Sequence, residues 1–257
     1  MSTAAVILTR PVVQAQDFAH KVVAMGRTVE FFPLLEIQPL QDNAALLARI
    51  KQLHDYALVA FVSPNAIDAF FRLVTDFPTK LPIAVMGEGS RACLARHGLH
   101  DQNARIIRPG NRFKTDSETL LDELDLPALR GKKVLIVRGE SGRELLADAL
   151  RTNGVEVDQV AAYRRVAPEL TPERADQLRR LLGAYNDWVI TSSEALRNLH
   201  TYVISLQLDD DVAKMQRQHL LMPHSRIEET AKSYGFQSIT LTASGDEQLL
   251  VALQSRL

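Results

Sequence analysis

The chain has 257 residues, about 1.7 times a typical domain of roughly 150, so one large α/β domain or two smaller domains would fit. Hydrophobic residues make up 46% of the chain and charged residues 24%, which excludes a disordered protein, a collagen and a coiled coil. Thirty basic residues against 31 acidic ones give a formal charge of −1, which disfavours a nucleic-acid-binding protein.

Short apolar runs alternate with longer segments of helical period, and this alternation predicts an α/β fold with parallel strands. Strands are expected near residues 5–9, 28–32, 57–62, 82–86, 105–107, 133–138, 156–163, 187–191, 219–222 and 238–241. Amphipathic helices are expected over residues 12–25, 64–75, 89–96, 118–124, 142–152, 172–182, 193–205, 225–233 and 246–256. Glycines that favour a left-handed helix end follow several of these helices, at Gly26, Gly98, Gly154 and Gly235.

Three strand-to-helix turns of the first half recur in the second half in the same order. The paired positions are Arg10 with Arg138, Ser63 with Ser192 and Ser90 with Ser225, at offsets of 138 − 10 = 128, 192 − 63 = 129 and 225 − 90 = 135. Such a recurrence predicts two similar lobes, each with a parallel sheet flanked by helices. A single continuous sheet containing all the strands would contradict this prediction.

Two extended stretches flanked by proline, residues 33–39 and 162–168, are candidates for crossings between the lobes. If both cross, the lobes are joined by a two-stranded extended linker. Lobe 1 would then comprise residues 1–35 and 168–257, lobe 2 residues 40–162, and the linker residues 36–39 and 163–167.

The compartment is expected to be the cytoplasm. One cysteine, Cys93, cannot form an intramolecular disulfide, which fits a reducing environment. The first residues carry no charged leader, and no run of about 18 apolar residues predicts a membrane helix.

The signatures of common catalytic centres are absent, among them Gly-x-Ser-x-Gly, paired Cys-x-x-Cys, His-Glu-x-x-His and the Walker A loop. Cys93, His97 and His100 are close in sequence. Because Gly98 is expected to end the helix between the two histidines, the three side chains would not share one face. We expect a buried thiol and surface histidines there, and no metal.

A glycine-rich turn at residues 87–92, Gly-Glu-Gly-Ser-Arg-Ala, follows one predicted strand and opens a helix. This spacing matches the pattern that binds a dinucleotide pyrophosphate, so an oxidoreductase that uses nicotinamide or flavin is one alternative. The next predicted strand, however, is flanked by Arg105 and Arg108 instead of the acidic residue that holds a ribose.

Hydroxyl- and glycine-bearing turns recur where predicted strands lead into helices. They are Thr9 with Arg10, Ser63, Gly89 with Ser90, Gly139 to Gly142, Thr191 with Ser192 and Ser193, and Ser225. Ligands of parallel α/β sheets bind at this edge, where helix N-termini present free N–H groups, so the set suits a polyanion. Alternatively each serine is only a helix N-cap, which stabilises its helix by about 1 kcal/mol.

Several short motifs stand in a characteristic order: Leu-Thr-Arg-Pro at 8–11, Pro-Leu-Leu-Glu-Ile at 33–37, Phe-Val-Ser-Pro-Asn-Ala at 61–66, Val-Leu-Ile-Val-Arg-Gly at 134–139 and Ala-Tyr-Arg-Arg at 162–165. With them the chain resembles the uroporphyrinogen-III synthase family almost end to end. The resemblance implies a two-lobed α/β enzyme with its active site in the cleft. It would cyclise hydroxymethylbilane, a linear tetrapyrrole with eight carboxylates, to uroporphyrinogen III. Water is lost and ring D is inverted, on the route to haem, sirohaem and cobalamin.

The resemblance also implies roles for particular residues. Tyr163 would assist departure of the substrate hydroxyl, worth about 10²- to 10⁴-fold in rate, unless it merely packs at a lobe junction. Residues assigned to substrate carboxylates are Ser63, Gly89, Ser90, Gly139, Thr191, Ser192, Ser193 and Ser225. The chain departs from the family pattern at Ser90 and Ser225, where relatives often have threonine, and at His224, which stands in a turn that is usually richer in small residues.

Arg10 and Arg138 are expected to bind carboxylates bidentately. Alternatively each neutralises a neighbouring Glu, and for Arg138 that residue is Glu140. No cofactor and no metal are implied. The expected partners are the small-molecule substrate and, transiently, the enzyme that produces hydroxymethylbilane, with the chain itself a monomer. The rival interpretation is a non-enzymatic two-lobed module that binds a small polyanion.

Overall fold

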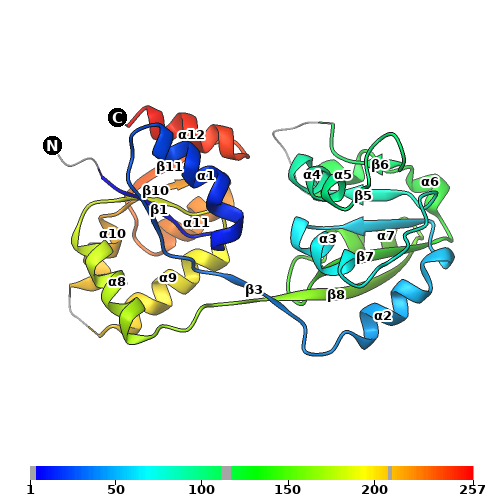
Figure 1. Cartoon of the computed structure of the whole chain (residues 1–257), viewed down its shortest axis with the longest axis horizontal. Coiled ribbons are helices and arrows are strands. Elements are labelled where there is room, and N and C mark those ends of the chain that lie inside the picture. Colours follow the sequence, from blue (N-terminus) through cyan, green and yellow to red (C-terminus); the bar gives the residue numbers. More distant parts are fainter. Residues whose placement is uncertain (1–3, 111–116, 208–209, 257) are drawn as a thin grey trace. The chain divides into compact units, whose positions relative to one another are not determined.

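The computed structural model describes residues 4–110, 117–207 and 210–256, so the predicted domain ends at 1 and 257 lie outside the described residues. The strands form two separate sheets (Figure 1). The chain divides into two compact units: unit 1 consists of Met1–Glu36 and Val166–Leu257, and unit 2 consists of Ile37–Arg165. The single sheet that would contradict the repeat is therefore not formed.

Unit 1 is built on a five-stranded parallel sheet in the order β11-β10-β9-β1-β2. Its strands are β1 (Val6–Leu8), β2 (Val29–Phe31), β9 (Asp187–Val189), β10 (His219–Met222) and β11 (Ser238–Leu241). Its helices are α1 (Val12–Ala24), α8 (Pro172–Gly183), α9 (Ser193–Ser205), α10 (Asp211–Gln216), α11 (Ser225–Ser233) and α12 (Asp246–Gln254).

Side chains alternate across the strands of unit 1, so each face of the sheet packs against its own helices. Val6 and Leu8 pack with α1 and α12, whereas Ile7 and Trp188 pack with α8, α9, α10 and α11. Figure 1 shows α1 and α12 together on one side of this sheet. Both faces of the three central strands, β1, β9 and β10, are buried, as expected for a parallel sheet, whereas the edge strands β2 and β11 are only partly buried.

Unit 2 contains a six-stranded sheet in the order β3-β8-β7-β4-β5-β6. Its strands are β3 (Glu36–Pro39), β4 (Leu58–Phe61), β5 (Ile83–Val85), β6 (Ile106–Ile107), β7 (Lys133–Gly139) and β8 (Glu156–Val166). Its helices are α2 (Ala44–Lys51), the 3₁₀ turn η1 (Leu53–Asp55), α3 (Pro64–Phe71), α4 (Glu88–Arg96), α5 (Ser117–Leu121), α6 (Leu126–Leu129) and α7 (Leu145–Thr152). The core on one face includes α2, α3 and α4, and the core on the other includes α5 and α7.

The two sheets repeat one strand order. Unit 1 runs β2-β1-β9-β10-β11, and unit 2 runs β8-β7-β4-β5-β6 when each sheet is followed from one side. The sequence repeat equates β1 with β7, β9 with β4 and β10 with β5, and these strands hold the same places in the two sheets. The prediction of two similar lobes with parallel sheets, which rested on three short recurring turns, is thus confirmed.

The predicted strands are all present, but residues 36–39 differ from the prediction. They were predicted to be one of two extended linker segments but were not named as a strand, and they form β3, which lies beside β8 in the sheet. The helices α2, α6 and α10 were not predicted. Each is short and buries few side chains, Leu46 alone in α2, so the hydrophobic period that reveals a helix is weak.

The predicted glycine helix ends are confirmed, because Gly26, Gly98, Gly154 and Gly235 have φ angles of 81°, 79°, 78° and 82°. The longest helices of the described residues, α1 and α9, have 13 residues each. None of the helices described has the length and apolar character needed to cross a bilayer.

Candidate functional site

The carboxyl edge of the sheet in unit 2 brings Ser63 and Tyr163 together. Ser63 follows β4 and Tyr163 lies in β8, with β7 between these two strands. The Ser63 Oγ and Tyr163 OH atoms are 3.1 Å apart, and either oxygen can be the donor. Tyr163 is only 4% exposed, so its ring belongs to the core while its hydroxyl reaches the edge where ligands of such sheets bind.

Gly139 at the end of β7 makes room for the Tyr163 ring. A Cβ atom at this position would lie 3.0 Å from the Tyr163 Cζ atom and 3.2 Å from Cε2. The β7–β8 register shifts between Arg138 and Gly139, so Gly139 pairs with Tyr163, and the Glu140 N–H donates to the Tyr163 carbonyl at 2.9 Å. The glycine and this bulge together fix the position of the phenol.

Ser63 also begins helix α3, as the N-cap alternative predicted. Its Oγ accepts from the Ala66 N–H at 3.2 Å, and Pro64 occupies the first helical position. Capping and contact with Tyr163 coexist because a hydroxyl oxygen can accept one hydrogen bond and donate another. The Ser63 hydroxyl therefore links the N-terminus of α3 to the Tyr163 phenol.

Arg138 is engaged within unit 2, but not by the predicted neighbour Glu140. Its Nη1 donates to the Glu144 carboxylate and, at 2.6 Å, to the Gln159 Oε1, and the Gln159 amide donates to Glu144. The hydrogen bonds from Gln159 and then Arg138 hold the pKa of Glu144 below its ordinary value. The structure corrects the predicted partner because residues 140–144 form a loop, and α7 begins at Leu145 instead of residue 142.

Gly142 allows this loop to close over the guanidinium. A Cβ atom there would lie 2.8 Å from the Arg138 Nη2, and the φ angle of 157° is one that other residues rarely adopt. Neither Glu144 nor Gln159 was singled out from the sequence. The i to i+6 separation of Arg138 and Glu144 corresponds to no helical or strand spacing, so no periodic signal indicated the pair.

The turn that contains Gly89 and Ser90 follows β5 and opens helix α4, as predicted, although the helix begins one residue earlier than residue 89. The helix begins at Glu88 with Gly87 as its N-cap, and Ser90 is buried in the first turn. Glu88 pairs with Arg91 at 2.5 Å, and an acidic side chain at the helix start disfavours a pyrophosphate. The glycine pattern thus reflects a tight turn into α4.

The equivalent edge of unit 1 holds Thr9, Arg10, Thr191, Ser192 and Ser193. The Thr9 hydroxyl donates to the Val189 carbonyl at 2.7 Å, which ties β1 to β9. Arg10 pairs with Asp246 at 2.9 Å, and its guanidinium lies 5.2 Å from the centre of the Phe18 ring. Thr191 is half-buried in the turn that precedes α9.

Ser192 is the N-cap of α9, and its Oγ accepts from the Glu194 N–H at 3.1 Å. Ser193 is buried and its hydroxyl donates to the Arg226 carbonyl at 3.4 Å. Ser225 is not an N-cap: His224 occupies that position, and Ser225 is the exposed first residue of α11. The N-cap alternative is thus confirmed for Ser63 and Ser192 and is wrong for Ser90, Ser193 and Ser225.

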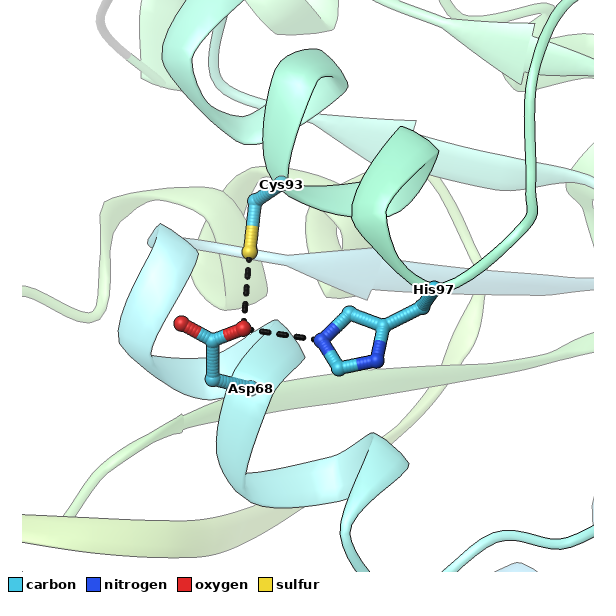
Figure 2. A group of neighbouring side chains, drawn as sticks. All are labelled: Asp68, Cys93 and His97. Carbon is cyan, nitrogen blue, oxygen red and sulfur yellow. Dashed lines mark hydrogen bonds and ion pairs between the residues drawn. The ribbon is translucent and has the colours of Figure 1, made fainter.

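One group of side chains in unit 2 has the chemistry of metal ligands. Figure 2 shows the Asp68 carboxylate between Cys93 and His97. The donor atoms of these three residues all lie within 4.8 Å of one another. Asp68 was missed in the sequence because it lies on α3, 25 residues before Cys93.

The model of the uroporphyrinogen-III synthase HemD family matches residues 16–250. The chain belongs to this family. Its similarity to the uroporphyrinogen-III synthase of Escherichia coli (strain K12) is 27% identity over 97% of this chain and 99% of the relative. The synthase of Synechococcus elongatus is 30% identical over 75% of this chain and 72% of its own length.

Solved structures of the family share the fold. A mutant uroporphyrinogen III synthase from the extremely thermophilic bacterium Thermus thermophilus aligns with a TM-score of 0.62 at 14% identity, over 98% of each chain. The uroporphyrinogen-III synthetase from Helicobacter pylori 26695 aligns with a TM-score of 0.60 at 14% identity, over 98% of this chain and all of the other. The family and the α/β fold predicted from the motifs are both confirmed.

Proposed function

We propose that this chain is a cyclising hydro-lyase that converts hydroxymethylbilane to uroporphyrinogen III in tetrapyrrole biosynthesis. Membership of the uroporphyrinogen-III synthase family supports the reaction. The observation that carries the chemistry is the hydrogen bond between Ser63 and Tyr163 at the carboxyl edge of unit 2. It presents one buried phenol whose hydroxyl is held in a defined direction.

The reaction begins with loss of the substrate hydroxyl as water, which leaves an azafulvene-type cation. The electron-rich substituted carbon of the terminal ring attacks this cation, and the resulting spiro intermediate rearranges and loses a proton to give the inverted product. Spontaneous closure gives the uninverted isomer, so the enzyme must above all hold a flexible polyanion in one conformation. A donor placed at the departing hydroxyl adds to this orientation effect.

The contacts of Ser63 suggest how Tyr163 becomes such a donor. The Ala66 N–H donates to Ser63, which leaves the Ser63 hydroxyl proton free to point at the Tyr163 oxygen. Tyr163 then directs its own proton toward the substrate hydroxyl. Hydrogen bonds in such a chain polarise one another, and the N-terminus of α3 adds positive potential, so negative charge developing on the phenol oxygen is stabilised.

We assign substrate carboxylates to the remaining predicted residues of the two edges: Arg10, Gly89, Ser90, Gly139, Thr191, Ser192, Ser193 and Ser225. The acidic Glu88 weighs against Gly89 and Ser90, although its pairing with Arg91 offsets part of its charge. Arg10 is the best supported, because its Nη2 is buried with no hydrogen-bond partner among the described residues. Arg138 has protein partners for its guanidinium, and these favour a structural role.

The proposal also includes units that fold as lobes with linkers at 36–39 and 163–167, a monomeric state, a cytoplasmic location and transient contact with the enzyme that supplies hydroxymethylbilane.

The test is isomer analysis of the product. Freshly generated hydroxymethylbilane is added to the purified protein, the reaction is quenched and oxidised early, and the uroporphyrin isomers are separated by chromatography. We expect type III in excess of the type I background. Type I alone from folded protein would reject the proposal. Protection by polyanions against thermal unfolding, without turnover, would then indicate a binding module.

A further inference from the structure

Asp68, Cys93 and His97 form a compact three-donor cluster on helices α3 and α4. The Cys93 Sγ lies 3.1 Å from the Asp68 Oδ1, and the His97 Nε2 lies 2.8 Å from the same oxygen. Figure 2 shows both side chains pointing at this one carboxylate oxygen. Sulfur, imidazole nitrogen and carboxylate oxygen therefore converge from two separate elements.

The local structure explains this convergence. Cys93 and His97 are four residues apart, and this spacing places them on one face of α4 and its C-cap. Gly98 ends the helix at once, with φ of 79°, so His100 is carried away as predicted. The third donor comes instead from α3, which packs against α4.

Neighbouring side chains orient two of the donors. The Phe71 ring stacks on the His97 imidazole, with 5.1 Å between the ring centres and 21° between the planes. The Arg96 Nη2 lies 3.6 Å from the Asp68 Oδ2, so Oδ1 remains directed at Cys93 and His97. Outer contacts of this kind fix metal ligands in proteins.

We propose that Asp68, Cys93 and His97 bind one divalent transition-metal ion of the zinc class. A tetrahedral zinc with bonds of about 2.0–2.3 Å needs donors about 3.3–3.6 Å apart. The Asp68 oxygen must therefore move away from Cys93 and His97, now at 3.1 Å and 2.8 Å, by about half an ångström, and the sulfur and the imidazole nitrogen already lie within 4.8 Å of each other. The mixed sulfur, nitrogen and oxygen set favours zinc over magnesium or calcium. Water fills the fourth position, because the Asp68 side chain is 41% exposed.

The hydrogen bonds among the three residues describe the metal-free cluster. Burial, together with the adjacent Asp68, raises the pKa of the Cys93 thiol to about 12, so the thiol keeps its proton and donates it to the carboxylate. A bound dication reverses this preference, because a coordinating thiol is deprotonated and its proton passes to solvent. The contact of Cys93 with the Pro64 carbonyl, at 3.5 Å, is then lost as a hydrogen bond.

Cobalt(II) provides a direct test, because Cys93 is the only cysteine in the chain. A thiolate-to-cobalt charge-transfer band can therefore arise from this position alone. We expect the band to saturate at one cobalt per chain and to disappear when zinc is added in competition. The measurement uses the full chain without tetrapyrrole, so its result is independent of the proposed function.

Variants identify the other two ligands. Asp68→Asn and His97→Gln should each weaken cobalt binding by at least about 10-fold, since even outer-shell partners have effects of that size. The matched control is His100→Gln, whose exposed side chain lies beyond Gly98 and should leave the affinity unchanged. Circular dichroism checks that each variant is folded.

Two results would overturn the proposal. One is a folded wild-type protein that shows no thiolate–cobalt band. The other is a band whose affinity is unchanged in both Asp68→Asn and His97→Gln, which would indicate a metal held by the thiol alone. If Asp68→Asn fails to fold, His97→Gln decides the question, because His97 lies at the end of its helix and is partly exposed.

Discussion

Arg10 and Arg138 occupy equivalent positions in the two sheets, yet their surroundings differ. Arg138 has a side chain that is only 10% exposed and is held by Glu144 and Gln159, whereas Arg10 makes a partly exposed pair with Asp246. The repeat therefore preserves the strand-end arginine but not its partners. Equivalent residues in a duplicated fold can thus have different partners and different exposure.

The capping serines show the same divergence. Ser63 and Ser192 each begin the helix that follows an equivalent strand, and each accepts backbone N–H groups. Only Ser63 also contacts a buried phenol, Tyr163. The capping geometry belongs to the fold, and the second contact is what distinguishes the carboxyl edge of unit 2.

At the amino end of the sheets the difference is one of charge. Asp187 in unit 1 is buried and contacts Arg27 at 2.5 Å, His219 at 2.7 Å and Arg256 at 3.1 Å. The repeat offset of 129 equates Asp187 with Leu58 of unit 2 (187 − 129 = 58), which packs in an apolar core. Polar contacts thus stabilise this end of unit 1, whereas hydrophobic packing stabilises the same end of unit 2.

The largest effect is expected from removing the phenol oxygen. Tyr163→Phe should lower kcat by about 10²- to 10⁴-fold, because a donor to the departing hydroxyl is lost. The melting temperature should change little, since one hydrogen bond contributes only about 1 kcal/mol. Initial rates of type III formation measure the effect.

Tyr202→Phe in unit 1 is the control for this substitution. The Tyr202 hydroxyl donates to the Pro168 carbonyl and lies outside the proposed site, so this variant should lose about 1 kcal/mol of stability and keep its rate. Equal kcat values for the two variants would contradict a chemical role for Tyr163.

The two arginines should respond oppositely to alanine. Arg138→Ala should lower the free energy of unfolding by about 1.5–3 kcal/mol, because Glu144 and Gln159 lose a charged partner. Arg10→Ala should lower the free energy of unfolding by less than about 1 kcal/mol, because its ion pair with Asp246 is partly exposed. It should raise KM about 10-fold, because one contact with a substrate carboxylate is lost. Chemical denaturation and steady-state kinetics distinguish the two, and the reverse pattern would exchange their roles.

Acid should weaken unit 1 through Asp187. Burial favours the neutral acid, but hydrogen bonds from His219 and Arg27 and the charge of Arg256 outweigh it and lower the pKa of Asp187 to about 2. Because the folded-state pKa lies below the unfolded value, the stabilisation is present above about pH 4 and is lost as the pH falls toward 2, amounting to about 2 kcal/mol.

Trp188, the only tryptophan, adjoins Asp187 and reports unfolding of unit 1 by its fluorescence. Asp187→Asn should be less stable than the wild type at pH 7, and the difference should shrink toward pH 2. A difference that is constant over this range would show that the carboxylate charge does not stabilise unit 1.

A methyl group at Gly139 should displace the Tyr163 ring by a few tenths of an ångström. Gly139→Ala should therefore lower kcat about 10-fold, because the displaced phenol would stabilise the transition state less well by about 1.4 kcal/mol. Gly183→Ala is the control, because no atom lies within 4 Å of a Cβ there and the residue ends α8 in unit 1. If both variants keep the wild-type rate, the close approach of glycine and ring has no catalytic importance.

The sequence predicted two similar lobes because the recurring turns at Arg10 and Arg138 mark equivalent positions, whereas the strand order within each sheet came from the structure. It could not predict that Glu144, rather than Glu140, contacts Arg138, because loop geometry decides which acid reaches the guanidinium. The N-cap alternative applied equally to all five serines of these turns, although only Ser63 and Ser192 immediately precede their helices. The contact of Ser63 with Tyr163 joins residues 100 positions apart, and it is visible only once β4, β7 and β8 are aligned.

The most direct test of the paired hydroxyls is a double-mutant cycle on the rate of type III formation. Ser63→Ala, Tyr163→Phe and the double variant are compared with the wild type. We predict that Ser63→Ala slows the wild-type enzyme about 10-fold but slows Tyr163→Phe less than about 2-fold, because Ser63 acts through the phenol. A 10-fold loss in both backgrounds would show that the two residues act independently and would contradict the account.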